Sequence, residues 1–436
     1  MEVGTISLFP QNTEVNSENH LLLGGCDSIG LAEEFGTPLY IFDEAALREK
    51  CAQYRQEFGQ RYPNTVIIYA CKAFINKALA LIFSEEGLGL DVVSGGELAI
   101  ARSVGFPMER VYFHGNNKSR SELALALEWG VGRIVVDNFN ELSLLDEVAK
   151  EVEASQEILL RLSPGVDPHT HAYIATGAVD SKFGFPMAQA EEAVNRAMSS
   201  SFSKLVGLHF HIGSQIFELE SYREAISIVL NFAAEMRAKY GFRLEEFSPG
   251  GGLAITYTQD SPAPSIADFA QVITSTLTDR CGELALEPPR LVVEPGRSIV
   301  GQAGVALYTV GAIKEVPGGR KYISIDGGMA DNIRPALYGA RYEAVVANKV
   351  KGDKQERVAI AGKFCESGDI LIRDIDLPLV EPGDIIAVPC CGAYCLAMAS
   401  TYNVSQKPAV VLVSEGRARL IRRRESYEDL MSYDVV

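Results

Sequence analysis

Short apolar runs alternate with longer amphipathic stretches between about residues 38 and 301. The short runs are rich in Val, Ile and aromatic residues, and the longer stretches repeat apolar positions at helical spacing. Many of these stretches open with Ser, Asn or Asp at a position suited to a helix N-cap. The predicted strands are 66–72, 89–94, 111–114, 133–137, 157–162, 206–212, 243–248 and 290–294, and the predicted helices include 76–86, 96–104, 119–128, 140–153, 188–199 and 221–240.

Eight strands with helices between them predict an α/β fold, a (β/α)8 TIM-type barrel over residues 37–303. The rival architecture is an open, doubly wound sheet. Its glycine fingerprint, G-x-G-x-x-G, is missing after the first predicted strand. The pattern therefore favours the closed barrel.

Beyond Gly304 the pattern changes to short alternating runs separated by Gly, Pro and Asp turns. Such a pattern is typical of a C-terminal antiparallel β-domain. The apolar run at 21–23 is too short to form a domain alone. We therefore assign residues 1–36 and 304–436 to the β-domain. Its clearest predicted strands are 305–310, 322–326, 358–361, 385–388 and 409–413.

Composition narrows the classes of partner. The chain has 436 residues and a formal net charge of −17, which argues against nucleic acid and anionic membranes as partners. No apolar run approaches the ~20 residues of a membrane helix, and residues 1–20 lack a secretory-signal layout. The eight cysteines form no paired C-x-x-C sets. Free thiols in a reducing cytoplasm are therefore expected.

Polar residues gather where the predicted barrel strands end, and barrel enzymes carry their chemistry at that end. The first strand runs into Lys72, a later strand leads to His211 and Ser214, and the last delivers Glu294 and Arg297. A lysine that ends a buried strand would be desolvated, which suits imine formation. The alternative is a lysine whose amine snorkels to solvent. The combination indicates a phosphate-bearing cofactor bound to lysine.

A glycine run supports the same interpretation. Gly250, Gly251 and Gly252 can present backbone N–H groups to a phosphate at close range, although a plain loop is the alternative. Glu294 could pair with a pyridinium nitrogen, or instead form a salt bridge with Arg297.

The histidines offer a ring contact rather than a metal site. His209 and His211 alternate along one strand, so only one should face the barrel centre, and we choose His211 as a lid for a planar ring. A His-x-His metal pair lacks a third His or carboxylate nearby. His169 and His171, in a loop with Asp167, do not favour a metal site either. We predict no metal.

Two further residues remain ambiguous from their surroundings. Asp91, at the end of the second strand, could orient Lys72 or cap the helix that follows. Cys365 lies in a loop beside glycine and charged residues, which favours a proton donor over a buried hydrophobe.

With these residues assembled, the chain resembles the diaminopimelate decarboxylase family of pyridoxal-phosphate enzymes, within the alanine racemase and ornithine decarboxylase fold group. The resemblance extends from Gly36 to Asn403. Its most specific stretches are 169–171 through 180–185, 209–215, 248–253, 294–297, 333–338, 365–369 and 392–394. Phe74 and Ala254 stand where family members often carry Asn and Gly.

The resemblance implies a role for each site residue. Lys72 would hold the cofactor as an internal aldimine, and Cys365 would return the proton. The implied cofactor contacts are Lys72, Asp91, His211, Ser214, Gly250, Gly251, Gly252, Glu294, Gly296, Arg297 and Tyr394. The implied substrate contacts are Arg297, Arg334 and Tyr338 for the distal carboxylate, Glu366 for the distal ammonium, and Tyr394.

The implied reaction is decarboxylation of meso-2,6-diaminopimelate to L-lysine. A homodimer with shared active sites is expected, because Cys365 and Glu366 reach the partner's site in that family, which places the β-domain at the dimer interface. Three alternatives remain: a decarboxylase of another basic amino acid or carboxylated polyamine, a non-catalytic cofactor-binding relative, and a barrel enzyme with another phosphate ligand. Arg334, together with Tyr338, argues against a substrate with a basic chain end.

Overall fold

The computed structural model describes residues 5–167 and 181–436 of the chain. It divides into two compact units, here called the barrel unit and the sheet unit. The barrel unit comprises Cys51–Ala254 and Ala263–Gly296, and the sheet unit comprises Met1–Lys50, Ile255–Pro262 and Arg297–Val436. The two boundaries proposed from the sequence, at 37 and 303, differ from this division.

Eight parallel strands form a closed ring within the described part of the barrel unit. Their order is β9-β11-β12-β13-β5-β6-β7-β8, and β8 pairs again with β9, which closes the ring. The strands are β5 (Thr65–Ala70), β6 (Gly89–Val92), β7 (Val111–Phe113), β8 (Arg133–Val136), β9 (Gln156–Ser163), β11 (Ser203–Phe210), β12 (Glu246–Ser248) and β13 (Arg290–Val293), with a short β10 (Phe185–Pro186) beside β9. The predicted TIM-type barrel is confirmed.

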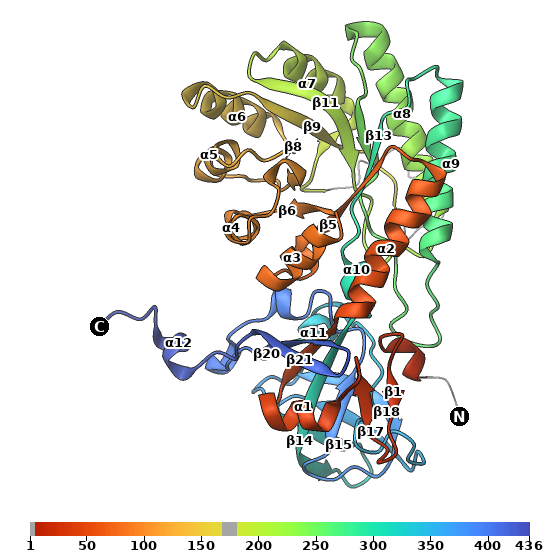
Figure 1. Cartoon of the computed structure of the whole chain (residues 1–436), viewed down its shortest axis with the longest axis vertical. Helices are drawn as coiled ribbons and strands as arrows, with labels where there is room; N and C mark the ends of the chain where they lie inside the picture. The colour runs from red at the N-terminus through yellow and green to blue at the C-terminus, as the bar shows by residue number, and fades with distance from the viewer. Residues whose placement is uncertain (1–4, 168–180) are drawn as a thin grey trace. The chain divides into compact units, whose positions relative to one another are not determined.

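Helices cover the outside of the ring (Figure 1). Their first turns are closed as the sequence indicates: Asn76, Ser94 and Asn138 accept from backbone N–H groups of α3, α4 and α6, and α5 and α9 begin with capping boxes. The helices are α2 (Glu44–Arg61), α3 (Lys77–Glu85), α4 (Gly95–Ser103), α5 (Arg120–Glu128), α6 (Phe139–Glu151), α7 (Met187–Ser199), α8 (Glu220–Tyr240) and α9 (Ile266–Glu283).

Apolar side chains from different strands fill the interior of the ring. Ile68, Val135, Leu159, Val206 and Val292 form one buried cluster there. Several strands end one or two residues earlier than predicted, because the chain turns into its loops at the point where the polar residues begin. After β5, for example, residues Cys71–Ala73 form the 3-10 turn η2.

The sheet unit is built on a mixed sheet, which corrects the purely antiparallel prediction. Strand β15 pairs with β17 in parallel, and β20 pairs with β4 in parallel. The latter two strands flank the barrel sequence, and a long connection of that kind allows parallel pairing where a hairpin does not. The strands are β1 (Glu14–Val15), β2 (Leu21–Leu23), β3 (Cys26–Asp27), β4 (Leu39–Asp43), β14 (Gly304–Glu315), β15 (Lys321–Ile325), β16 (Val345–Val346), β17 (Glu356–Ala361), β18 (Ile370–Leu377), β19 (Ile385–Val388), β20 (Ala409–Ser414) and β21 (Arg417–Arg422).

Short helices complete this unit: α1 (Ser28–Phe35), α10 (Arg297–Val300), α11 (Arg334–Tyr338) and α12 (Tyr427–Met431). The core packs Leu21 and Leu23 against Ile41, Val305 and Val411, so the N-terminal segment shares the apolar core of the main sheet.

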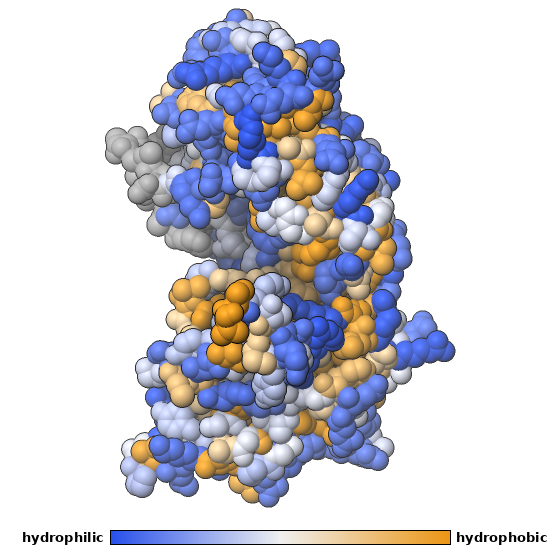
Figure 2. Space-filling model, turned by 90° about the vertical axis from the view of Figure 1, so that its left-hand side faces the viewer, coloured by the Kyte–Doolittle hydropathy of each residue, from blue (hydrophilic) through white to orange (hydrophobic). Residues whose placement is uncertain are grey.

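Hydrophilic side chains make up most of the face seen in Figure 2, with apolar side chains between them in small groups. None of the described helices combines the length and apolar composition needed to cross a membrane. All eight cysteines are free thiols, as expected, and seven are buried; Cys365 is the exposed one.

Candidate active site

Lys72 and Asp91 lie at neighbouring strand ends of the barrel unit. Lys72 sits in the η2 turn after β5, with Nζ 3.8 Å from Oδ2 of Asp91, which belongs to β6. The Lys72 side chain is 42% exposed, so the prediction that it is desolvated is wrong: the chain has already left the strand. Ser94 caps α4, which also rules out the cap role for Asp91.

Asp91 is buried, and this burial raises its pKa to about 7. The nearby Lys72 ammonium opposes the shift, whereas the negative charge of Glu294 adds to it. Asp91 is therefore close to its midpoint of protonation at neutral pH and sensitive to the charge of the lysine beside it.

Glu294 directly follows β13. It is buried, and its carboxylate takes part in two hydrogen bonds. His209 Nε2 lies 3.1 Å from Oε2, and the Ser248 hydroxyl donates to Oε1 at 2.8 Å. Burial alone would raise the pKa of Glu294, but His209, His114 and these hydrogen bonds outweigh it and lower the pKa below the ordinary 4.5. The structure thus presents an ionised, oriented carboxylate, whose position is explained without a salt bridge to Arg297.

The positions of His209 and His211 differ from those predicted from the sequence. His209 lies on β11 with 1% of its surface exposed, and its ring meets that of His114 edge to face at 4.9 Å between centroids. The prediction that His209 points away from the barrel centre is wrong. Strand β11 ends at Phe210, so His211 already belongs to the loop and strand alternation does not fix its direction.

His114, missed in the sequence, completes a group with His209 and Glu294 whose ligand atoms all lie within 4.8 Å of one another. The prediction that no third His or carboxylate lies near His209 is therefore wrong. Ring closure brings the ends of β7, β11 and β13 together, which sequence spacing does not reveal. Hydrogen bonding already explains the His209–Glu294 contact, so we assign no metal. His169 and His171 lie outside the described residues.

The loop of Gly250, Gly251 and Gly252 requires glycine. A Cβ on Gly251 would lie 1.9 Å from the carbonyl oxygen of Glu294, and one on Gly252 would lie 2.3 Å from that of Gly213. Gly250 and Gly252 also have φ of +76° and +107°, which favour glycine. Because these residues have no side chains, the backbone of the loop can come close to a ligand.

His211 lies against this loop and is half-buried. Its Nδ1 accepts a hydrogen bond from the Gly251 N–H at 3.4 Å. Burial, assisted by the charges of Lys72 and Arg161, lowers the pKa of His211 well below 6.5, so its ring is neutral at pH 7. Ser214, two residues beyond Ile212 in the same loop, is exposed.

Gly296 lies at the seam between the last strand and the first. A Cβ there would meet the Cβ of Ala70 at 3.0 Å, and the Ala70 N–H donates to the carbonyl of Pro295 at 3.0 Å. The two departures from the family pattern are ordinary packed positions, since Phe74 and Ala254 are both buried.

These groups fit pyridoxal phosphate. Among the described residues, Asp91 Oδ1, His114 Nε2 and His209 Nδ1 are buried polar atoms without a hydrogen-bond partner. The charge of Lys72 acts on Asp91, His114, His209 and His211, so the amine and these groups belong to one site. The amine suits the aldehyde of the cofactor, and the buried carboxylate suits its ring nitrogen. The neutral imidazole suits a face of the ring, and the open glycine loop suits the phosphate.

The sheet unit carries a second set of predicted residues, arranged around Tyr257. The Arg297 Nη1 donates to the Tyr257 hydroxyl at 2.5 Å, and its guanidinium lies 4.6 Å from the ring centroid of Tyr394. Arg334 is buried, lies 4.5 Å from the Tyr257 ring centroid and donates to the Tyr342 hydroxyl. Tyr257 and Tyr342 were missed from the sequence. The structure thus brings two of the predicted arginines to one aromatic ring.

Three other predicted residues of this unit are exposed. Tyr338 ends α11 with 64% of its surface exposed, although Arg334 in the same helix is buried. Cys365 and Glu366 lie in a loop whose backbone is held by Asn403, which accepts from the Cys365 N–H at 3.0 Å. Both side chains are therefore available at the surface of the unit, as the sequence predicts for Cys365.

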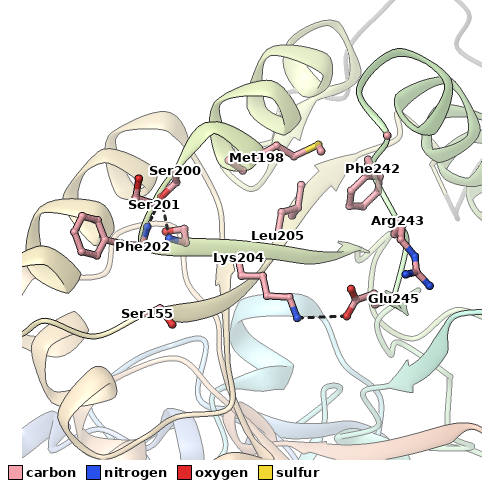
Figure 3. A pocket seen from close by; sticks show the side chains of 13 residues that line it. Ser155, Met198, Ser200, Ser201, Phe202, Lys204, Leu205, Phe242, Arg243 and Glu245 are labelled. Atoms are coloured by element: carbon pink, nitrogen blue, oxygen red, sulfur yellow. Dashed lines mark hydrogen bonds and ion pairs between the residues drawn. The ribbon is translucent and has the colours of Figure 1, made fainter.

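A separate hollow of about 470 Å³ lies at the opposite, amino-terminal end of β9, β11 and β12 (Figure 3). Lys204, one of its lining residues, forms ion pairs with Glu157 at 2.8 Å and Glu245 at 3.6 Å. Arg243 pairs with Glu287. Because these charges are already matched, and this end of a barrel usually contributes stability, we do not count the hollow with the candidate site.

Comparison with known proteins is consistent with this geometry. Residues 44–301 match the family model described as pyridoxal-dependent decarboxylase, pyridoxal binding domain. The chain is 48% identical over 422 residues to the diaminopimelate decarboxylase of Bacillus subtilis, which covers 96% of each protein.

Solved structures agree. The crystal structure of diaminopimelate decarboxylase from M. jannaschii in complex with L-lysine has a TM-score of 0.92 and 37% identity, over 98% of each chain. That of the Helicobacter pylori enzyme with L-lysine has a TM-score of 0.83 and 32% identity, over 92% of this chain and 98% of the other.

Proposed function

The chain belongs to the diaminopimelate decarboxylase family of pyridoxal-dependent decarboxylases, and from this premise we propose that it converts meso-2,6-diaminopimelate to L-lysine and carbon dioxide. The observation that carries the proposal is the match over nearly the whole chain, together with an amine, a carboxylate and a glycine loop at one end of the barrel. The predicted family and cofactor class are confirmed by the family comparison.

In the barrel unit we assign Lys72 as the amine that binds pyridoxal phosphate covalently. Asp91 orients that amine, and Glu294 pairs with the ring nitrogen. His211 covers one face of the ring, and the neutral state of its imidazole suits stacking. The phosphate is assigned to the glycine loop Gly250–Gly252 with Ser214 and Gly296, and the family resemblance adds Arg297 and Tyr394 as cofactor contacts.

When bound, pyridoxal phosphate supplies a ring that accepts the electron pair released as carbon dioxide leaves. Glu294 contributes by staying ionised and so holding a proton on the ring nitrogen. Cys365 then donates a proton to the carbon that lost its carboxylate. Cys365 is exposed whereas the other seven thiols are buried, so this is the thiol that a substrate can reach.

Selectivity is assigned to Arg297, Arg334 and Tyr338 for the distal carboxylate, and to Glu366 for the distal ammonium. A substrate without the second carboxylate would leave a buried guanidinium unpaired. Such losses are on the order of several kcal/mol, or roughly 10³-fold in discrimination. Lysine and ornithine should therefore be poor substrates.

We further propose a homodimer that acts in the cytoplasm. Support for shared sites comes from the exposure of Cys365 and Glu366, whose side chains lie at the surface of the sheet unit. The exposed apolar side chains Leu337 and Val404 of the same unit suit an interface. The eight free thiols suit a reducing compartment.

Product analysis tests the reaction. The purified protein with pyridoxal phosphate should turn diaminopimelate into lysine and should leave lysine and ornithine almost unchanged. Preference for ornithine would favour a sister decarboxylase. A colourless protein that binds no cofactor would favour the binding-protein alternative. Borohydride reduction should label a peptide containing Lys72, and Lys72→Ala should lose the label; a label on another lysine would refute the assignment.

Mixing two inactive variants tests the shared site. If Lys72 and Cys365 act together across a dimer, mixed Lys72→Ala and Cys365→Ala subunits should regain about a quarter of wild-type activity through hybrid dimers. Each variant alone should stay nearly inactive, and Cys365→Ala should still bind cofactor. No recovery after subunit exchange, verified by differently tagged chains, would contradict sharing.

A further inference from the structure

Glu294 is surrounded by side chains whose roles the proposed function leaves open. Both of its oxygens are hydrogen-bonded inside the barrel unit, Oε2 by His209 on β11 and Oε1 by Ser248 at the end of β12. All three residues are at least 95% buried. Buried hydrogen bonds to an ionised group are stronger than ordinary ones, so these contacts bear directly on the state of the carboxylate.

The direction of the Ser248 hydrogen bond follows from its second partner. The Gly250 N–H, which can only donate, lies 3.2 Å from the Ser248 oxygen. The serine therefore accepts from the glycine loop and has its own proton available for Glu294. A carboxylate oxygen that accepts a hydrogen bond from this hydroxyl carries no proton itself.

The same reasoning applies to His209. Burial lowers its pKa below 6.5, so the ring is neutral at pH 7 and carries one N–H. Nε2 faces the Glu294 oxygen, whereas Nδ1 has no hydrogen-bond partner among the described residues. The proton belongs on Nε2, where it is donated to the carboxylate.

His114, which directly follows β7, supports the positions of His209 and Glu294. Its ring packs edge to face on His209, and its Nε2 lies 3.6 Å from Glu294 Oε1 and 3.7 Å from Asp91 Oδ1. Burial lowers the pKa of His114 well below 6.5 as well, so an uncharged ring separates the two carboxylates.

We propose that His209 and Ser248 are positioning residues that keep Glu294 ionised and aimed, so that its charge stays available to the ring nitrogen of the cofactor. The inference rests on the proposed function, in which Glu294 pairs with that nitrogen. Neither residue touches the reacting carbon in this assignment. They act through Glu294, and His114 acts through His209.

Variants of the holoenzyme test this role. His209→Phe keeps an aromatic ring of similar shape but removes the donor, and His209→Gln restores an N–H at about the same reach. His209→Phe should still bind one cofactor per chain with KM within about twofold of wild type. Its kcat should fall about 10- to 100-fold, the size expected for a lost hydrogen bond to a charged group, and His209→Gln should recover most of it.

A spectroscopic readout separates this role from simple packing. The visible absorbance of the lysine-bound cofactor should titrate at a different pH in His209→Phe, because a less supported Glu294 changes the protonation of the ring. Asp91, His114, Arg161 and Lys72, the other ionisable groups acting around this carboxylate, remain in every variant.

Coupling to Glu294 gives the decisive outcome. In a Glu294→Gln background, adding His209→Phe should lower kcat by less than about threefold, since the group through which it acts is gone. Effects that multiply, or a His209→Phe protein with wild-type absorbance and kcat, would overturn the inference. A wild type that is colourless or inactive would overturn the proposed function as well.

Ser248→Ala keeps the test available if His209→Phe does not fold. It should lower kcat in the same direction by about 3- to 10-fold and should also lose its effect in the Glu294→Gln background. The exposed Ser143→Ala serves as the matched control and should match wild type. An unchanged Ser248→Ala would count against the proposal.

Discussion

Asp91→Asn should make the cofactor-free protein more stable at alkaline pH, although it removes a residue of the site. Asp91 is fully buried and its pKa rises from 3.8 to about 7, with burial as the largest cause. Between these two values the unfolded chain has released the proton and the folded protein has kept it. Folding stability therefore falls as pH rises through this window, and asparagine, which does not titrate, escapes the loss.

The size of the effect follows from the shift. One pKa unit corresponds to about 1.4 kcal/mol, so the raised pKa of Asp91 lowers folding stability by about 2 kcal/mol at pH 5 and about 4 kcal/mol at pH 8. The advantage of Asp91→Asn over wild type should therefore grow by about 2 to 3 kcal/mol between these pH values.

Urea unfolding of both cofactor-free proteins at pH 5, 6, 7 and 8 measures this difference. The exposed Asp353→Asn is the matched control, and its difference from wild type should not change with pH. A constant offset between Asp91→Asn and wild type across the series would refute the reasoning, because it would show that Asp91 is ionised in the folded protein throughout.

Three further predictions concern the glycine loop, the substrate arginine and a buried ion pair. Gly251→Ala should lose most of its bound cofactor and unfold several degrees lower, on the order of 3 °C, because the new Cβ collides with the Glu294 carbonyl. Arg334→Gln should bind cofactor normally but lose at least about 100-fold in kcat/KM for diaminopimelate. Lys118→Met should cost about 3–5 kcal/mol in urea unfolding, because Lys118 is buried and donates to Glu141 at 2.6 Å.

Matched variants accompany these measurements. Gly96→Ala, whose Cβ would meet its nearest atom at 3.6 Å, should keep its cofactor, and the exposed Arg341→Gln should keep full kcat/KM. Adding Glu141→Leu to Lys118→Met should recover part of the lost stability. Normal cofactor content in Gly251→Ala, unchanged selectivity in Arg334→Gln, or no recovery in the double variant would contradict the respective structural reason.

The barrel could be predicted because each strand is a local signal: an apolar run bounded by a cap and a helix. Residues just after those runs, such as Lys72 and Glu294, could be proposed as site residues for the same reason. The run at Leu39–Asp43 shows the limit. Five buried residues in a row suit a central strand of either unit, and only the pairing with β14 and β20 assigns it to the sheet.

The contacts around Glu294 could not be predicted, because they depend on closure of the ring. His114, His209 and Ser248 come from three strand ends far apart in sequence, and the rule of alternation pointed to His211 instead. Tyr257 and Tyr342 carry no local signal either, since a tyrosine in a loop has no pattern that marks it as the partner of an arginine.

The seam between β13 and β5 has a consequence for biosynthesis. The Ala70 N–H reaches the Pro295 carbonyl, so the segment bearing Lys72 is completed by one translated much later. A nascent polypeptide that has left the ribosome only as far as α9 already holds Lys72 and Asp91, but it still lacks Glu294 and the strand that pairs with β5 on its other side. Binding of pyridoxal phosphate must therefore await the end of barrel synthesis, and a chain truncated before β13 would remain colourless.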